Sequence, residues 1–246
     1  MAARSRGKGI SEFIKTVVYA LVIAAVIRSF LFEPFSIPSG SMMPTLLIGD
    51  YLFVSKYAYG YSRFSFPFSL PLFSGRIFER MPKQGDVIVF RLPSDTSTDY
   101  VKRVIGLPGD RVQVINGILH VNGKAVERTL VGDFKADRGG FGQPRRYLEY
   151  RETLPNGVQH LILEISDDAP MDSTDVYTVP DGTVFVMGDN RDSSRDSRFL
   201  ADVGYIPVEN IVGRAEIIFF SLDGPIYRVF VDSGTIRWSR FFNVIR

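Results

Sequence analysis

Cysteine is absent from the 246-residue chain, and histidine occurs only twice, as His120 and His160. Without cysteine the chain cannot have a disulfide framework, a thiol nucleophile or a thiolate metal site. With two histidines it cannot build a histidine-rich metal site, and imidazole is scarce for acid–base catalysis. Because the sequence also has no phosphate-binding loop, we expect no metal, nucleotide or other cofactor.

A strong net charge is also missing, since 29 Lys and Arg residues oppose 27 Asp and Glu residues. The excess is confined to the first 15 residues, where Arg4, Arg6, Lys8 and Lys15 oppose Glu12 alone. The rest of the chain holds 25 basic and 26 acidic residues. A nucleic-acid-binding domain needs a basic face on its folded part, so the sequence predicts no nucleic-acid partner.

Long hydrophobic runs are scarce as well, and only VVYALVIAAVI, from Val17 to Ile27, stands out. Extended to residues 14–32, this run would form a helix about 28 Å long, close to the thickness of a hydrocarbon core. Lys15 and Arg28 could extend to the two interfaces. A single run excludes a multi-span transporter. With 45% hydrophobic and 23% charged residues, the chain is also not a mostly disordered one.

The run has three interpretations: a retained membrane anchor, a cleaved signal peptide or a buried core helix. No small-x-small cleavage site follows it directly, which disfavours a signal peptide. Its length disfavours a core helix, so we favour the anchor. The positive-inside rule then leaves residues 1–13 as a basic cytoplasmic tail and sends the chain after Phe32 across the membrane.

Short strand-like runs separated by turns dominate the chain after residue 33. The dipeptides Asn116-Gly117 and Asn122-Gly123 predict a hairpin and its continuation. Outside the anchor, helical periodicity is found mainly in Ile236–Ile245. Strands are predicted at residues 51–54, 86–91, 101–105, 111–115, 118–121, 158–165, 183–187, 211–220 and 227–230.

Two segments differ from this pattern. Residues 125–175 are more polar and irregular, which is typical of an insertion or a subdomain. Residues 64–73 alternate aromatic residues with two prolines and cannot form a regular central strand. They form either a hydrophobic loop packed on the core or a loop that dips into the bilayer surface, where phenylalanine is favourable.

Three polar strings beside apolar strands could carry chemistry. In PSGSMMPTL (residues 38–46), Gly40 allows a tight turn that presents the Ser41 hydroxyl and leaves backbone N–H groups free for an oxyanion, although Ser-Gly-Ser is also a common loop sequence. In YVKRVIGLPGD (100–110), strand alternation puts Lys102 and Arg103 on opposite faces. Either both reach solvent at a strand edge, or Lys102 points into an apolar pocket and becomes a neutral base for a serine.

The third string, GDNRDSSRDSR (188–198), directly follows the apolar run 183–187. A loop with so many charges is usually solvated, but this one begins at the core. Its acidic and basic side chains can pair and hold the loop rigid, and its serine hydroxyls can orient an amine. Pairing with arginines explains Asp189, Asp192 and Asp196 better than a metal does.

Together the three strings resemble the sequence boxes of bacterial type I signal peptidases, the Ser/Lys endopeptidases that remove signal peptides from exported proteins. PSGSMMPTL resembles the nucleophile box, YVKRVIGLPGD the general-base box and GDNRDSSRDSR the last catalytic box, while QGDVIVF (84–90) resembles the strand between the first two. The order and spacing of these strings behind an anchor make the resemblance specific. Some members of the family have two anchors and a disulfide, which this chain lacks.

By matching positions, the resemblance implies that Ser41 is the nucleophile and neutral Lys102 the general base. Ser39 would donate its hydroxyl, and Ser41 its backbone N–H, to the oxyanion, while Ser194 would orient the Lys102 amine. The other implied residues are the structural ion pair Asp196–Arg198, Asp189 as structural support near the site, and Met42 near the substrate cleft.

The resemblance also implies a mainly β fold, in which an N-terminal transmembrane helix precedes a large antiparallel β-sheet catalytic domain with an inserted β subdomain. The catalytic core would comprise residues 33–107 and 181–246, and the insertion residues 108–180. The enzyme would be single-pass in the bacterial cytoplasmic membrane, with its catalytic domain on the periplasmic side. Its partners would be signal peptides of preproteins, the lipid bilayer and the export translocase.

Three other functions remain open from the sequence. A Ser/Lys peptidase specialised for one pilin or conjugation substrate would share the same residues and differ in substrate range. A membrane-tethered β scaffold would explain the anchor and the strands, but not Ser41, Lys102 and Ser194 together. A cytoplasmic self-cleaving Ser/Lys repressor is disfavoured by the anchor and by the lack of a DNA-binding helix pair.

Overall fold

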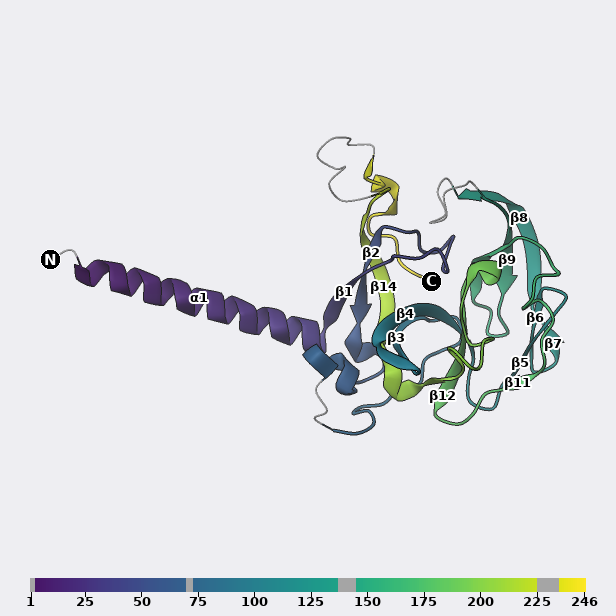
Figure 1. Cartoon of the computed structure of the whole chain (residues 1–246), viewed down its shortest axis with the longest axis horizontal. Coiled ribbons are helices and arrows are strands. Elements are labelled where there is room, and N and C mark those ends of the chain that lie inside the picture. Colours follow the sequence, from purple (N-terminus) through teal and green to yellow (C-terminus); the bar gives the residue numbers. More distant parts are fainter. Residues whose placement is uncertain (1–2, 70–72, 137–144, 225–234) are drawn as a thin grey trace.

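A computed structural model describes residues 3–69, 73–136, 145–224 and 235–246. The N-terminal helix α1 (Ala3–Phe30) projects from a body built of β-strands (Figure 1). Its segment Gly9–Phe30 has a mean hydropathy of 2.0, and every residue of it except Ser29 is exposed. By length and composition, it is the one helix among the described residues that could cross a membrane. A buried core helix is therefore excluded.

The helix ends two residues before the predicted limit of the anchor at Phe32. That residue pairs with Ser55 and begins strand β1 (Phe32–Ser36). Pro34 favours this change, because a proline disfavours helical geometry at the residue before it. Glu33 also forms salt bridges with Nη2 of Arg28 (2.6 Å) and with Nζ of Lys56 (2.7 Å). These ion pairs fix the junction between the helix and the β body.

Seven of the described strands form one antiparallel sheet in the order β1-β2-β14-β3-β4-β12-β13. The mainly β, antiparallel fold is thereby confirmed. Five of these strands agree with the predicted runs to within a few residues, although β4 begins earlier than expected. The bounds are β2 (Asp50–Ser55), β3 (Val87–Leu92), β4 (Asp95–Gly106), β12 (Thr183–Met187), β13 (Ile206–Pro207) and β14 (Ile211–Ser221).

The strands between residues 108 and 180 form two further sheets. One has the order β11-β5-β6-β7 and contains the hairpin predicted at Asn116-Gly117, where both residues have positive φ angles. The other, β10-β9-β8, lies within residues 125–175, and its strand β10 confirms the strand predicted at residues 158–165. The bounds are β5 (Arg111–Ile115), β6 (Ile118–Val121), β7 (Lys124–Ala125), β8 (Glu127–Ala136), β9 (Arg145–Thr153), β10 (Gln159–Glu164) and β11 (Tyr177–Thr178).

Strands β8 and β9 were not predicted, because they are rich in charged residues. They pair along nearly their whole length, and both contain exposed side chains, such as Leu130 in β8 and Arg151 in β9. Ladder hydrogen bonds therefore hold a hairpin that has no strict hydrophobic alternation. The division into a core and an insertion at residues 108–180 stays a prediction.

Both faces of the large sheet are covered. Alternate residues of β3 belong to two different clusters of the core, with Val87 and Val89 in one and Ile88 and Phe90 in the other. All four side chains are almost completely buried. Strand β4 lies beside β3 in the sheet, and residues at its carboxyl end are consequently buried whichever way they point.

The aromatic segment 64–73 contacts the carboxyl end of α1. Its described part contains two short 3₁₀ helices, η2 (Arg63–Ser65) and η3 (Pro67–Ser69), in agreement with the prediction that it cannot be a regular strand. The ring of Phe66 contacts that of Phe30, the last residue of α1, at 5.6 Å. Contact of this segment with the bilayer surface stays a prediction.

The predicted helical pattern of Ile236–Ile245 was wrong. These residues form one short 3₁₀ helix, η8 (Trp238–Arg240), and otherwise run along β14. The N–H of Phe242 donates to the carbonyl of Ile218 (2.7 Å), and the N–H of Ile245 donates to that of Glu216 (2.9 Å). Tertiary hydrogen bonds override the local periodicity here. The predicted strand 227–230 lies outside the described residues.

Candidate active site

Ser41 and Lys102 meet in the structure, although 61 positions separate them in the chain. Ser41 lies in the loop between β1 and β2, and Lys102 lies near the carboxyl end of β4. Nζ of Lys102 is hydrogen-bonded to Oγ of Ser41 at 2.7 Å and donates to the carbonyl of Val101 at 3.0 Å. When the amine is neutral, the serine hydroxyl can donate to it, as a general base requires.

The Lys102 side chain is 3% exposed. Burial, which disfavours the charged ammonium, lowers the pKa of Lys102 from 10.5 to about 8, while the carboxylates of Asp196 and Asp189 oppose the shift. The amine therefore loses its proton at a lower pH than a free lysine does. The prediction that Lys102 turns into the protein, rather than reaching solvent at a strand edge, agrees with this burial.

Ser39 is exposed and close to Ser41, the candidate nucleophile. Its Oγ lies 3.4 Å from Oγ of Ser41. Between the two serines, Gly40 packs tightly, since a Cβ atom at this position would lie 2.8 Å from Cε of Met43. A residue with a side chain would therefore displace Met43, and glycine lets the turn bring the two hydroxyl groups together.

Asn190 holds the serine loop by two hydrogen bonds. Its backbone N–H donates to the carbonyl of Ser41 (3.1 Å), and its Nδ2 donates to the carbonyl of Gly40 (3.0 Å). The residue is fully buried in the loop that follows β12. It was not singled out from the sequence, although it lies in the string 188–198. An asparagine in a polar loop gives no signal of a partner 150 positions away.

Arg103, the neighbour of Lys102, is also fully buried. Its guanidinium binds both carboxylate oxygens of Asp189, at 2.8 and 2.7 Å, and donates to the carbonyl of Gly85. The alternative in which both cations reach solvent is thus wrong, because both faces of β4 are covered at this point. Burial alone would raise the pKa of Asp189, but the Arg103 charge and hydrogen bonds lower it. Asp189 therefore stays ionised.

Asp196 and Arg198 form the ion pair implied by the resemblance. Nε of Arg198 lies 2.9 Å from Oδ1 of Asp196, and both side chains are buried. Oδ2 of Asp196 also accepts the N–H of Gly188 at 3.0 Å. Burial would raise the pKa of Asp196, but the Arg198 charge and these hydrogen bonds hold it low. The pair fixes the loop that follows β12 next to Lys102.

Ser194 lies in the same loop and is buried. A Cβ atom on Gly188 would lie 2.2 Å from Oγ of Ser194 and 2.5 Å from the carbonyl oxygen of Ser41, so the three residues are closely packed. Within the described residues, no hydrogen bond joins the Ser194 hydroxyl to the Lys102 amine. A role of Ser194 in orienting the amine stays a prediction.

Two expectations about single residues need correction. Met42 is 1% exposed and packs in the core with Ile37 and Leu46, so its side chain offers no surface to a substrate in this structure. Asp192 does not pair with an arginine as expected. Its Oδ2 accepts backbone N–H groups of Ile165 (2.6 Å) and Ser166 (3.3 Å) instead.

A buried network of charges next to the site was missed from the sequence. Glu152 in β9 pairs with Arg191, with Nη1 and Oε1 3.0 Å apart, and Nε2 of His160 lies 3.2 Å from Oε2 of Glu152. Burial would raise the pKa of Glu152, but the charge of Arg191 and the contact with His160 lower it to about 2. Burial and the nearby Arg103 lower the pKa of His160, which leaves this histidine neutral. His160 thus contacts the carboxylates of Glu152 and Asp189 rather than the candidate nucleophile.

Comparison with known protein families matches the part of the chain that contains the candidate site. The family model described as "Signal peptidase, peptidase S26" matches residues 10–220 of this chain. This range includes all of the residues of the candidate site and the part of α1 from residue 10 onward. The chain belongs to the signal peptidase family, peptidase S26.

Curated relatives agree with this membership. Signal peptidase I of Rickettsia canadensis is 45% identical over 84% of this chain and 78% of its own length. Signal peptidase I of Rickettsia typhi is 43% identical over 87% of this chain and 81% of its own length. The crystal structure of a signal peptidase I from Enterococcus faecalis V583 is 25% identical, with a TM-score of 0.33, and covers 55% of this chain and 97% of its own.

Membership in the signal peptidase family makes this chain a serine peptidase and supports removal of signal peptides as its activity. Preproteins are the substrates that such an activity implies. The apolar helix α1 is consistent with a membrane-anchored enzyme of this family. Sequence patterns thus led to the correct family, and the structure adds the contacts that surround its candidate nucleophile.

Proposed function

We propose that the chain is a membrane-bound serine endopeptidase that removes N-terminal signal peptides from exported preproteins, with Ser41 as nucleophile and neutral Lys102 as general base. The observation that carries this proposal is the 2.7 Å contact between Nζ of Lys102 and Oγ of Ser41, made by an amine that is almost fully buried. A buried lysine is costly unless its charge is removed or paired. Here the partner of the amine is the Ser41 hydroxyl, which can donate its proton only to a neutral amine.

The reaction is acyl transfer in two halves. Nζ of Lys102 takes the hydroxyl proton as Oγ of Ser41 attacks the scissile carbonyl carbon. The carbon–nitrogen bond then breaks, and the leaving amine takes the proton from Lys102. In the second half, a water molecule gives a proton to Lys102 and attacks the acyl-enzyme. The acid leaves, and the proton returns to Oγ of Ser41.

The negative charge on the carbonyl oxygen needs donors during both halves. The Ser39 hydroxyl, 3.4 Å from Oγ of Ser41, and the backbone N–H of Ser41 are the proposed donors. Asn190 supports them, because it fixes the carbonyl groups of Gly40 and Ser41 and thereby the direction of the turn. Four further residues act indirectly, because they hold Lys102 and the loop after β12 in position: Ser194, Asp189, Asp196 and Arg198.

The proposed location follows from the helix. With α1 across the bacterial cytoplasmic membrane and its basic start inside, the β body lies on the periplasmic side, where signal peptides emerge from the export translocase. Ser41 follows the last residue of α1 by only eleven positions, so cleavage takes place close to the membrane surface. Small residues at positions −1 and −3 of the substrate fit a site of this class.

A peptide that spans a signal-sequence Ala-x-Ala junction tests the proposal. We expect the full chain in detergent to cut it once, after the second alanine. Ser41→Ala and Lys102→Met remove the nucleophile and the base, and both should abolish cleavage. Asp133→Asn, which changes an exposed carboxylate paired with Arg146, is the control and should cleave at the wild-type rate.

The rival functions give different results in the same experiment. Cleavage that persists in Ser41→Ala contradicts the assigned nucleophile. An intact peptide with folded wild-type protein contradicts general signal-peptide processing. It favours a peptidase with one private substrate or a tethered scaffold.

A further inference from the structure

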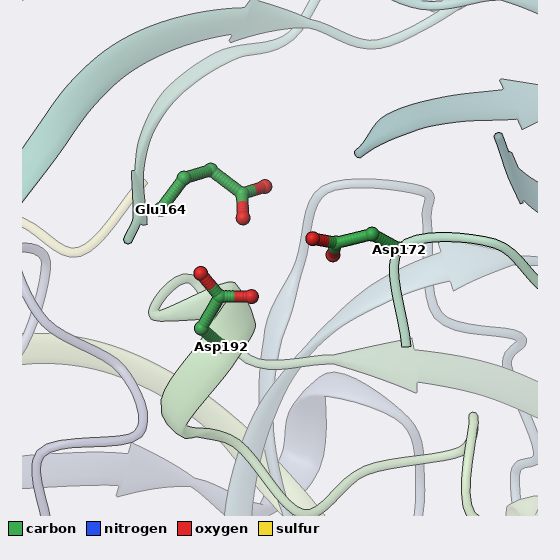
Figure 2. A group of neighbouring side chains, drawn as sticks. All are labelled: Glu164, Asp172 and Asp192. Atoms are coloured by element: carbon green, nitrogen blue, oxygen red, sulfur yellow. The ribbon is translucent and has the colours of Figure 1, made fainter. Parts of the chain in front are cut away.

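Three carboxylates converge at a place outside the catalytic contacts. Glu164 is the last residue of β10, Asp172 lies in the loop before β11, and Asp192 lies in the 3₁₀ helix η4 (Arg191–Ser193). One oxygen from each lies within 4.8 Å of one from each of the other two. Figure 2 shows the carboxylates pointing toward a common centre. Like charges at such distances repel one another unless something lies between them.

Glu164 has a buried oxygen without a partner. The residue is 1% exposed, and its Oε2 has no hydrogen-bond partner among the described residues. An unpaired carboxylate in this position is costly, and burial raises the pKa of Glu164 to about 8. The carboxylate turns into the centre formed with Asp172 and Asp192. A cation at that centre would satisfy it.

Backbone contacts hold the two aspartates in place. Oδ2 of Asp172 accepts the N–H of Ala169 at 2.7 Å, and Oδ2 of Asp192 accepts those of Ile165 and Ser166. For both side chains, no hydrogen bond to Oδ1 is found in the described part of the chain. Each aspartate is thus fixed by one oxygen and retains acceptor capacity for a ligand.

The neighbouring arginines already have other partners. Arg191 pairs with Glu152, and Arg198 pairs with Asp196. Arg128 approaches Oε1 of Glu164 only to 3.9 Å, while its Nη2 lies 2.8 Å from Asp167. These cations reduce the negative charge of the cluster from one side, but they do not occupy its centre.

We propose that a calcium ion binds between Glu164, Asp172 and Asp192 and ties the inserted strands to the loop that follows β12. Calcium prefers carboxylate, carbonyl and water oxygens at 2.3–2.6 Å, so opposite ligands in its shell are about 5 Å apart. Oxygens that lie within 4.8 Å of one another match that span. Magnesium needs a tighter shell and keeps more of its water.

The ion has a structural role that sequence reasoning did not foresee. Asp192 lies two residues before Ser194 and four before Asp196. Glu164 and Asp172 belong to the segment 108–180. A cation shared by them holds the end of β10 against the loop of the candidate site. It takes no part in acyl transfer, and its binding is measured without any peptide substrate.

Thermal unfolding of the full chain in detergent, after treatment with a chelator, tests the proposal. Calcium sites in extracellular modules have Kd values on the order of 10⁻⁴–10⁻³ M. At 10 mM CaCl2 we therefore expect the Tm to rise by about 3–5 °C over the chelated protein. Sodium chloride at equal ionic strength should give no such rise, and MgCl2 a smaller one.

Glu164→Gln is the decisive variant. It keeps the shape of the side chain and removes the buried charge, so its Tm with chelator should equal or exceed that of the wild type, and calcium should no longer raise it. Asp192→Asn should likewise abolish the calcium response. This variant replaces Glu164→Gln in the test if Glu164→Gln does not fold. Asp133→Asn, on the exposed β8–β9 hairpin, should keep the full response.

Three results would overturn the proposal. The first is a wild-type Tm that calcium does not change. The second is an equal calcium response in the wild type and in the variants of the cluster. The third is a magnesium response as large as that of calcium, which rules out calcium as the preferred ion. Each leaves peptide cleavage by Ser41 and Lys102 untouched, because the unfolding measurement contains no substrate.

Discussion

Lys102 and Arg103 are neighbours in β4, and both are buried, but their partners differ. Arg103 meets the two oxygens of Asp189, a geometry in which a guanidinium remains charged. Lys102 meets a hydroxyl and a carbonyl, so burial lowers its pKa to about 8. Adjacent cations in one strand thus have different surroundings: Arg103 is held in an ion pair, and Lys102 is the proposed proton acceptor.

The Arg103–Asp189 pair should be essential for stability. Asp189→Asn leaves the Arg103 charge buried without its carboxylate, and breaking a buried pair in this way costs about 3–5 kcal/mol. Urea unfolding of the full chain in detergent, followed by circular dichroism, measures the loss. Asp133→Asn breaks an exposed pair and should be indistinguishable from the wild type. Equal midpoints for the two variants would show that the buried pair does not stabilise the protein.

Some residues of the site can be predicted from sequence and others cannot. Ser41 and Lys102 lie in strings whose residue types suggest their chemistry, and the structure brings them together. Asn190 and Glu152 have no such signal, because their importance comes from partners far away in the chain. Met42 illustrates the opposite error, since the family resemblance placed it near the substrate cleft, but the fold buries its side chain in the core.

Among the elements, β12 and the loop after it organise the site. β12 pairs with β4, which carries Lys102, and the loop contacts the serine turn through Asn190. Gly188 lies where this loop begins and where the loops approach most closely. Any side chain at this position would destabilise the packing, because its Cβ atom would clash with the backbone oxygen of Ser41.

Gly188→Ala should disable the enzyme without unfolding it. The new Cβ atom would lie 2.5 Å from the carbonyl oxygen of Ser41 and 2.2 Å from Oγ of Ser194, so one of them must move. A displacement of about 1 Å in a catalytic group can lower the rate by about 10²-fold. Peptide cleavage measures kcat. Gly132→Ala is the control: no atom lies within 4 Å of its new Cβ, so this variant should keep the wild-type kcat. Unchanged kcat in Gly188→Ala would argue against this packing.

Elements were predictable where local chemistry decides them. Asn-Gly dipeptides fixed the turns around β6, and apolar runs marked β3 and β12. The hairpin β8–β9 was missed, because charged residues on exposed strands give no alternation to detect. The C-terminal segment was assigned to a helix, because its hydrogen bonds to β14 are invisible in its own sequence.

At the scale of the whole molecule, the protein is a β body carried on one apolar helix (Figure 1). The contacts at the junction are ionic and aromatic, with Glu33 bound by Arg28 and Lys56, and Phe30 packed against Tyr61 and Phe66. Such a junction fixes the body close to the end of the helix. The site therefore has a defined height relative to the membrane if α1 spans it.

Charges placed in the middle of α1 should release the protein from membranes. Lysine costs about 2.5–3.5 kcal/mol at the centre of a spanning helix, so Ala24→Lys with Ala25→Lys should prevent stable insertion. Flotation of the full chain with lipid vesicles measures the bound fraction. Two lysines at the exposed positions Thr96 and Thr178 add the same charge elsewhere and should leave flotation intact. If the α1 variant floats as well as the wild type, the helix is not the anchor.

The pH dependence of kcat/KM tests the central claim, a Ser41 nucleophile with a neutral Lys102 base, most directly. Only the unprotonated amine can take the serine proton, and its pKa of about 8 lies far below that of a free lysine. We predict that kcat/KM for the Ala-x-Ala peptide rises about tenfold per pH unit up to about pH 8 and is level above it. Lys102→Met should show no activity at any pH. A wild-type profile that stays flat down to pH 5 would contradict the assignment of Lys102 as the base.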